Sequence, residues 1–243
     1  MINTEVQKTA VSREMNDTFL QGVRDCVPTL LGYMSIGFAF GIVGVASHLS
    51  ILEICLLSLC VYAGAAQFII CSLLVSGSPI SAIILTTFIV NLRHLLLSLT
   101  IAPYFTKYSL AKNIGFGALL TDESFGVAVN KAAQNGRLYD KWMNGLNITA
   151  YMCWVISCVM GGLLGQWISD PYALGLDFAL PAMFAALLVL QLQSSASEKL
   201  KHSLSLILYM IIFMVLLSYF VPSHIAVIAS TVIVATIGVV TDK

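Results

Sequence analysis

The residues most suited to chemistry lie inside an apolar stretch, where charged side chains are costly. The segment IVNLRHLLLS places Asn91, Arg93 and His94 near the middle of a nearly all-apolar run, residues 79–103. An Arg, Lys or Asp at the centre of a membrane helix costs about 2.5–3.5 kcal/mol, so such residues usually face a partner or a cavity. This pattern predicts that one side of the segment does not meet lipid.

A second group of ionisable side chains follows at Asp122 and Glu123. Two interpretations of Arg93 remain open: a buried ion pair with one of these carboxylates, or direct contact with a substrate carboxylate. His94 is able to change its charge near physiological pH, which suits proton coupling, but an interhelical hydrogen bond also explains it. The two acidic residues further suit the first turn of a helix that begins at residue 121 or 122.

Small and polar residues interrupt another apolar run at VYAGAAQFII, residues 61–70. Gly64 permits a broken helix, whose free amides and carbonyls are able to line a site. Tight packing with Gln67 bonded between helices is the alternative. Asp177 precedes Pro181 by four residues and is expected to cap a helix. The candidate substrate- or ion-binding residues are Gln67, Asn91, Arg93, His94, Asp122 and Glu123.

The elements that must position these residues are apolar helices. The 243 residues are 58% hydrophobic and only 10% charged, whereas soluble domains carry about 25% charged residues. A spanning helix needs roughly 20 mostly apolar residues. We therefore expect an all-α, polytopic transmembrane bundle with about seven or eight hydrophobic segments, at least one of them broken or re-entrant. The segments are 26–46, 51–76, 79–103, 142–168, 174–192, 203–221 and 223–240, with a weaker one at 114–130.

The distribution of polar residues predicts the domain organisation and orientation. Residues 1–25 are expected to form a polar cytoplasmic segment, and residues 26–243 a single transmembrane domain. The N-terminus lacks the basic start and apolar core of a signal peptide. Because Lys and Arg concentrate in cytoplasmic loops, both termini are expected inside, with an even number of crossings. Either 114–130 crosses, giving eight spans, or one segment is re-entrant, giving six; Lys107 and Lys112 argue against eight.

Glycine-rich stretches in the two halves resemble each other. GFAFGIVG at 37–44 resembles GGLLG at 161–165, and YAGAAQF and MFAALLV each begin eighteen positions after the last glycine. This pattern suggests an internal repeat of the kind that many transporters contain. Close packing of helices alone is the other explanation for such glycines.

Several classes of protein are disfavoured. Twelve basic and twelve acidic residues give zero formal charge, which provides no basic surface for nucleic acid. The six cysteines form no C-x-x-C pair and no zinc-binding spacing with histidine, so we expect reduced packing residues and no metal. No P-loop, G-x-S-x-G or H-E-x-x-H motif is present. We expect neither an enzyme nor a cofactor; Asp122 with His94 is the one pairing worth testing for catalysis.

Four stretches, GYMSIGFAFG, YAGAAQF, NLRHLLLS and LLTDESF, resemble the AzlC-type large subunit of the branched-chain amino-acid exporter family. A fifth, GLDFALPAMFAALL, supports the resemblance, which extends over most of residues 28–190. The order and spacing of AGAAQF, NLRH and TDE make the match specific. Ser35 departs from it, because similar sequences often have proline there.

The resemblance implies a secondary exporter of leucine, isoleucine, valine and methionine in the bacterial cytoplasmic (inner) membrane, run by the proton motive force. It also implies a small hydrophobic partner of the AzlD type. The substrate carboxylate would need a cationic or helix-N-terminal contact, from Arg93 or the amides around 64–67. An apolar pocket would hold the side chain. An amino-acid-permeable channel and a non-transporting scaffold subunit remain alternatives. The phenylalanines available for the pocket are Phe68, Phe88, Phe125 and Phe184.

Overall fold

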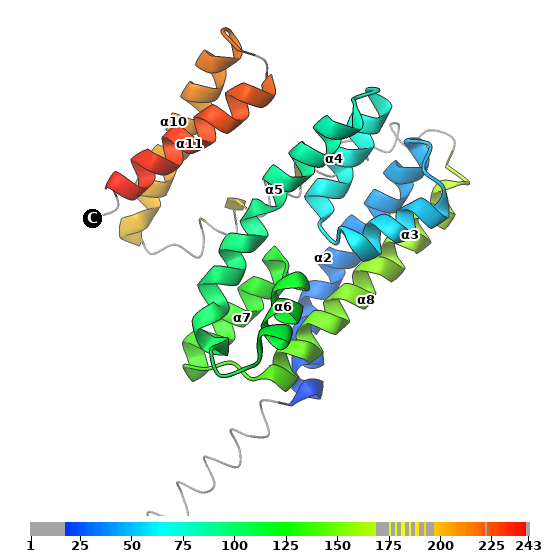
Figure 1. Cartoon of the computed structure of the whole chain (residues 1–243), viewed down its shortest axis with the longest axis vertical. Helices are drawn as coiled ribbons and strands as arrows, with labels where there is room; N and C mark the ends of the chain where they lie inside the picture. The colour runs from blue at the N-terminus through cyan, green and yellow to red at the C-terminus, as the bar shows by residue number, and fades with distance from the viewer. Residues whose placement is uncertain are drawn as a thin grey trace, which may run out of the picture. The chain divides into compact units, whose positions relative to one another are not determined.

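A computed structural model describes residues 18–168, 197–221 and 223–241, with single positions between 175 and 192. All regular elements of these residues are helices, which confirms the expected all-α fold (Figure 1). The chain divides into two compact units, 1–180 and 181–243, which are considered separately. Most of the polar segment 1–25 and of the expected span 174–192, including Asp177 and Phe184, lies outside the described residues.

Three long helices form the frame of the first unit. They are α2 (Phe19–Ala46), α5 (Ile80–Ile101) and α8 (Asp140–Gly165), of 28, 22 and 26 residues. At 1.5 Å per residue they are about 42, 33 and 39 Å long, enough to cross a hydrocarbon core of about 30 Å. A short 3-10 helix, η1 (Ala102–Phe105), extends α5.

Glycines bring α2 and α8 into backbone contact. A Cβ added at Gly41 would collide with the Cys158 carbonyl oxygen, and one at Gly161 would collide with the backbone of Phe38. Close approach of this kind is the usual role of regularly spaced glycines in membrane helices. Packing therefore accounts for these glycines, and the internal repeat stays a prediction, because much of its second half lies outside the described residues.

Four short helices form two pairs, each with a break in the middle. The first pair is α3 (Ile51–Cys60) and α4 (Gly64–Val75), and the second is α6 (Leu110–Ala118) and α7 (Asp122–Asn135). Their lengths, about 14–21 Å at 1.5 Å per residue, are too short for any of them to cross a bilayer alone. The apolar run 51–76 is thus two helices.

The outer ends of α6 and α7 both lie at the end of the unit where α2 and α8 begin (Figure 1). Near the start of α6, Lys112 Nζ lies 2.7 Å from the carboxylate of Asp140, the first residue of α8. Near the end of α7, Lys131 Nζ lies 3.4 Å from the carboxylate of Asp25 in α2. The pair α6 and α7 is therefore a hairpin that enters and leaves on one side.

The outer ends of α3 and α4 lie at the opposite end. A Cβ on Gly44, near the end of α2, would meet Ile54 of α3 at 2.9 Å. The loop 76–79 joins α4 to the start of α5, and the chain beyond α5 reaches the start of α8, where the Asp140 amide donates to the Tyr108 hydroxyl at 3.1 Å. Two hairpins therefore enter the unit from opposite ends.

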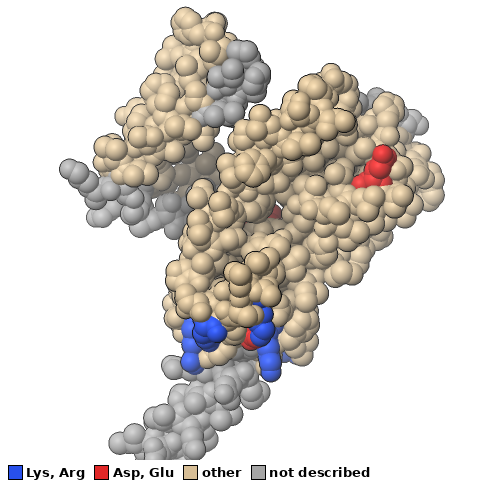
Figure 2. Space-filling model, viewed as in Figure 1, with Lys and Arg blue, Asp and Glu red and all other residues tan. Residues whose placement is uncertain are grey.

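Basic side chains gather at the end from which α6 and α7 enter, at the bottom of Figure 2. An excess of Lys and Arg marks the cytoplasmic side. The hairpin removes the topological difficulty posed by Lys107 and Lys112, because the chain returns to the side from which it came. The exposed or partly exposed basic residues there are Arg24, Lys107, Lys112, Lys131, Arg137 and Lys141.

The expected seven or eight hydrophobic segments are not confirmed as spans. Among the described residues, four helices are long and apolar enough to cross a membrane: α2, α5 with η1, α8 and residues 200–218. The two halves of the apolar run 51–76 are each much shorter, so a hydropathy pattern does not by itself distinguish a crossing from half of a hairpin.

The second unit contains a helical hairpin of α10 (Ser197–Ser218) and α11 (Ser223–Thr241). The His202 ring nitrogen and the Thr241 hydroxyl are 2.8 Å apart and join the start of α10 to the end of α11. A Cβ on Gly238 would meet the Leu206 side chain at 3.1 Å, so the two helices pack closely there.

Candidate functional site

An ion pair joins the middle of α5 to the break between α6 and α7. Arg93 Nη1 lies 2.9 Å from Asp122 Oδ2, and the two side chains are 27% and 25% exposed. Of the two interpretations of Arg93, the ion pair is present, with Asp122 as its partner, and contact with a substrate carboxylate stays a prediction. Neither side chain is fully enclosed by the described residues, so part of the pair is open to contact with another group.

A capping box fixes the start of α7. The Ser124 amide donates to the Thr121 hydroxyl at 3.3 Å, and the Thr121 amide donates to the Ser124 hydroxyl at 2.9 Å. The predicted helix start at residue 121 or 122 is confirmed. The cap holds Asp122 and Glu123 in the first turn, where the helix dipole favours negative charge.

Two further ionisable groups lie around the pair. His94 is within electrostatic range of Arg93 and Asp122, and Glu123 is within range of the same two residues. Among the described residues no Lys, Arg or His forms an ion pair with Glu123. Four of the six candidate residues are thus gathered where α5 meets the start of α7.

Asn91 contributes an unsatisfied acceptor to α5. Its Oδ1 atom is buried and has no hydrogen-bond partner among the residues that the structure describes, and the same is true of the hydroxyl of Thr87, one turn earlier. Buried polar atoms normally find partners. These two atoms are therefore available to water or to a ligand.

Gln67 has a different environment. It is fully buried, its Nε2 atom donates to the Ser58 hydroxyl at 3.3 Å, and its Oε1 atom accepts from Trp154 Nε1 at 3.1 Å. Both ends of the amide are engaged, so Gln67 holds α4 against α3 and α8. In this conformation it matches the packing interpretation, and no contact joins it directly to the Arg93–Asp122 pair.

An aromatic cluster connects Gln67 with that pair. The ring of Trp154 packs edge-on against Tyr33 at 6.2 Å, and the Tyr33 hydroxyl is hydrogen-bonded to the hydroxyl of Thr121. Tyr62 lies between α3 and α4 and packs on Tyr151. Sequence reasoning missed these residues, because an aromatic side chain in an apolar run normally indicates packing. The tyrosine that begins YAGAAQF, Tyr62, was the feature of the sequence that could have indicated this cluster.

The phenylalanines proposed for an apolar substrate pocket are dispersed. Phe68 is buried and packs on Phe40 at 5.8 Å, whereas Phe88 is 63% exposed. Phe125 is only partly buried. Phe68 and Phe88 therefore do not share a pocket in this conformation.

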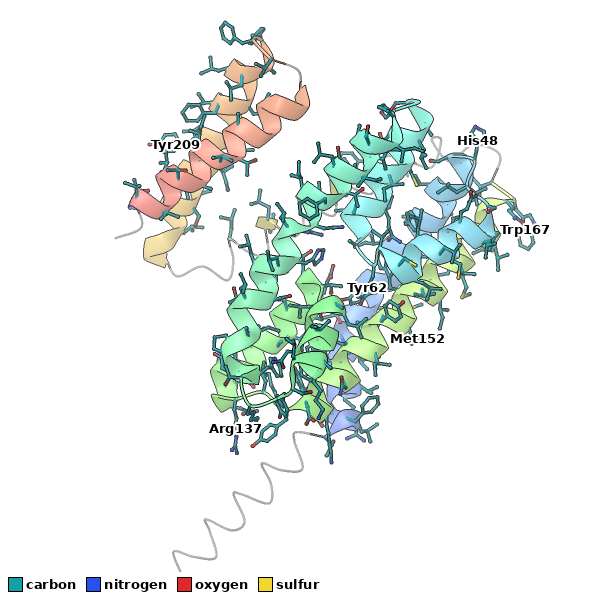
Figure 3. The ribbon with its side chains drawn as sticks, in the orientation of Figure 1. His48, Tyr62, Arg137, Met152, Trp167 and Tyr209 are labelled. Carbon is teal, nitrogen blue, oxygen red and sulfur yellow. The ribbon has the colours of Figure 1, made fainter. Side chains whose placement is uncertain are left out.

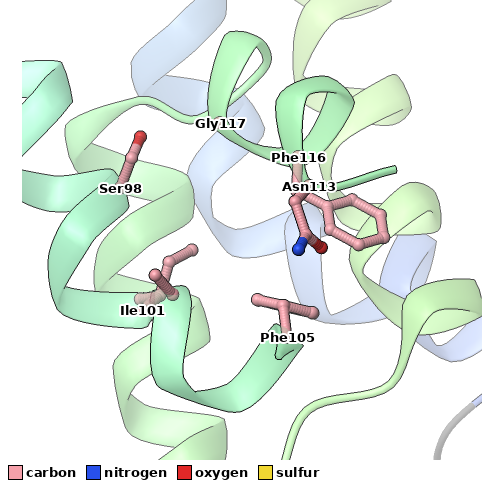
Figure 4. Close-up of a pocket in the computed structure, with 7 residues that line it drawn as sticks. Ser98, Ile101, Phe105, Asn113, Phe116 and Gly117 are labelled. Carbon is pink, nitrogen blue, oxygen red and sulfur yellow. The ribbon is translucent and has the colours of Figure 1, made fainter. Parts of the chain in front are cut away.

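A cavity of about 60 Å³ lies between the end of α5 and α6 (Figure 4). Asn113 Oδ1 in its wall is buried and has no hydrogen-bond partner among the described residues. The cavity exceeds the roughly 10–15 Å³ that one water molecule needs, so it is large enough to hold water. Ser98, another wall residue, is five residues beyond Arg93 on α5, so polar atoms extend from the ion pair toward the basic end. The lining residues are Ser98, Ile101, Ala102, Phe105, Asn113, Phe116 and Gly117.

A wider groove of about 470 Å³ opens at the same end, between α2 and α7. Asp25 within it accepts hydrogen bonds from Gln21 Nε2 at 2.8 Å, Trp142 Nε1 at 2.8 Å and Lys131 Nζ at 3.4 Å. Since these contacts satisfy the carboxylate, Asp25 joins α2, α7 and α8 and has a structural role at the end of the unit.

Comparison with known proteins identifies the family. The family model described as AzlC protein matches residues 28–168, more than half of the chain. The inner membrane protein YgaZ of Escherichia coli K12 is 31% identical over 185 residues, which are 74% of this chain and 76% of that protein. An uncharacterized membrane protein of Archaeoglobus fulgidus is 34% identical over 174 residues, 70% and 74% of the two chains.

A third relative has a transport name. The branched-chain amino acid transport protein AzlC of Bacillus subtilis 168 is 26% identical over 194 residues, 78% of this chain and 73% of that protein. No solved structure matches. The matched segment includes the Arg93–Asp122 pair and both hairpins, and several relatives are named as membrane proteins. The chain is a multi-pass membrane protein and belongs to the AzlC family.

Proposed function

We propose that the chain is the large subunit of a secondary transporter that exports leucine, isoleucine, valine and methionine across the cytoplasmic membrane in exchange for protons. Family membership and the name of the Bacillus subtilis relative support this substrate class. Following the family, we expect a small hydrophobic AzlD-type membrane subunit as the partner.

The observation that carries the proposal is the Arg93–Asp122 pair between α5 and the break before α7. A guanidinium binds carboxylates well, so Arg93 is suited to the carboxylate of an amino acid. Asn91, His94 and Glu123 would complete the site around it. Gln67 would border the site by holding α4 in place.

Exchange requires that the substrate and the proton exclude each other at the site. With an acidic side chain beside Arg93 ionised, the substrate would bind with its carboxylate on Arg93 and its ammonium group near that side chain, and a proton on the same side chain would remove the ammonium contact and release the substrate. His94 lies within electrostatic range of Arg93 and Asp122, so its charge would also bias the exchange. A ligand shifts a conformational equilibrium only through a difference in affinity between the states, and the making and breaking of these contacts would supply that difference.

Reconstitution tests the proposal. Proteoliposomes with the chain and its partner are loaded with labelled leucine, and efflux is measured with and without an imposed pH gradient. We expect efflux that a proton gradient of opposite direction accelerates, and counterflow when unlabelled leucine is outside. A channel would follow the leucine gradient alone and give no counterflow, and a scaffold would give no flux. Unchanged leucine efflux from cells that lack both subunits would contradict the proposal.

A further inference from the structure

Tyr62, between α3 and α4, has an unusual backbone conformation. Its φ is +42°, a region that bulky residues adopt only when their surroundings hold them there. The side chain is 6% exposed and packs edge-on against Tyr151, with ring centroids 4.8 Å apart. Figure 3 shows Tyr62 at mid-height in the first unit, between Arg137 at one end and His48 and Trp167 at the other.

The hydroxyl of Tyr62 is buried and forms no hydrogen bond of good geometry with any described residue. The hydroxyl of Tyr33 is its neighbour. Tyr33 in turn is bonded to Thr121, the cap of α7. The Tyr62 hydroxyl is also within electrostatic range of Glu123. A buried hydroxyl without a partner is destabilising, so a ligand that donates a hydrogen bond to it would be favoured there.

Glu123 and Asp122 differ although they are adjacent. Asp122 is neutralised by Arg93 at 2.9 Å, whereas Glu123 forms no ion pair with the described residues. Glu123 is partly buried beside the aromatic side chains of Tyr33 and Tyr62. A carboxylate, a free hydroxyl oxygen and aromatic rings together suit a primary ammonium group, which offers three N–H donors and a positive charge.

We propose that Tyr62 and Glu123 form the subsite for the α-ammonium group of the transported amino acid. The hydroxyl of Tyr62 accepts a hydrogen bond from the ammonium group, and Glu123 supplies the opposite charge. This assignment rests on the proposed function. Glu123 lies on the side of the substrate's ammonium group, and Arg93 with Asp122 lies on the side of its carboxylate. Tyr62 lies in the break between α3 and α4, and Glu123 lies in the first turn of α7.

The test compares leucine with 4-methylpentanoate, which has the same carboxylate and branched side chain but lacks the amino group. Each compound competes with labelled leucine in counterflow by proteoliposomes that contain the full chain and its partner. The variants are Tyr62→Phe, which keeps the ring, and Glu123→Gln, which keeps the shape. Tyr151→Phe is the matched control, because it removes the neighbouring hydroxyl, which donates to the Leu59 carbonyl at 2.8 Å.

We expect the wild-type protein to prefer leucine strongly and Tyr62→Phe to reduce that preference about tenfold, the loss of one hydrogen bond to a charged group. Glu123→Gln should reduce it at least as much, while Tyr151→Phe leaves it unchanged. If Tyr62→Phe and Glu123→Gln both transport with the full preference, the ammonium subsite is wrong and the exporter proposal stands. If the wild-type protein exchanges no branched-chain amino acid, both proposals fail.

Discussion

Removing the charges of Arg93 and Asp122 separately and then together separates a structural role from a role in transport. The variants are Arg93→Gln, Asp122→Asn and the double substitution. Each single variant leaves a charge without its partner at the junction of α5 and α7, and the double variant leaves none. Stability and transport are then compared in the same four proteins.

The expected magnitude follows from the geometry of the pair. Unit charges about 4 Å apart at an effective dielectric constant of about 20 attract each other by about 4 kcal/mol. The side chains of this pair are 27% and 25% exposed, which lowers the net value. We expect a coupling free energy of about 2 kcal/mol between the two substitutions. In a chain of this size that corresponds to about 4–8 °C in Tm.

Thermal unfolding in detergent measures the first quantity and leucine counterflow the second. The double variant should be about 4–8 °C more stable than the sum of the single effects predicts, yet Arg93→Gln and the double variant should both fail to transport, because Arg93 is needed for the substrate. Lys112→Gln is the control: it breaks an exposed pair with Asp140 and should leave both measurements unchanged. Restored transport in the double variant would refute the assignment of Arg93 to substrate binding.

Three further predictions concern the framework. Gly41→Leu should prevent folding, because its side chain would enter the backbone of α8, whereas Gly32→Ala, with no atom within 4 Å of the added Cβ, should accumulate normally in membranes. Thr121→Val should lower the free energy of unfolding by about 1 kcal/mol through loss of the α7 cap, and Thr121→Ser should not; denaturant unfolding checks this. Single cysteines at Lys112 and Glu53, in a background without the native cysteines, should react with an impermeant maleimide from opposite sides of the membrane; labelling of both from one side would contradict the opposed hairpins.

The cost of charge in an apolar environment made part of the site predictable. Arg93 needed a partner at membrane depth, and the Asp122 carboxylate was one of two available. The start of α7 was equally predictable from the sequence, because Thr121 followed by two acidic residues is typical of a helix N-terminus. Both predictions used local chemistry that the sequence displays directly.

The hairpins could not be predicted from the sequence in the same way. The break at 61–63 has apolar residues on both sides, so hydropathy describes 51–76 as one run, and only Gly64 suggested an interruption. In the break between α3 and α4, Tyr62 has a left-handed backbone and packs against Tyr151, a contact distant in the sequence. In the sequence, Tyr62 is indistinguishable from an aromatic residue that only packs. In the folded chain, its buried hydroxyl without a hydrogen-bond partner among the described residues sets it apart.

The backbone contact between α2 and α8 determines which parts of the first unit are free to move. Carbonyl oxygens of one helix occupy the places where the other lacks side chains, so neither helix is able to slide or rotate without a steric clash. In α5, by contrast, Ile101 is the one fully buried residue. Within the described part of the first unit, a rocking motion that opens the two sides in turn would therefore move α5 and the hairpins, while α2 and α8 stay fixed relative to each other.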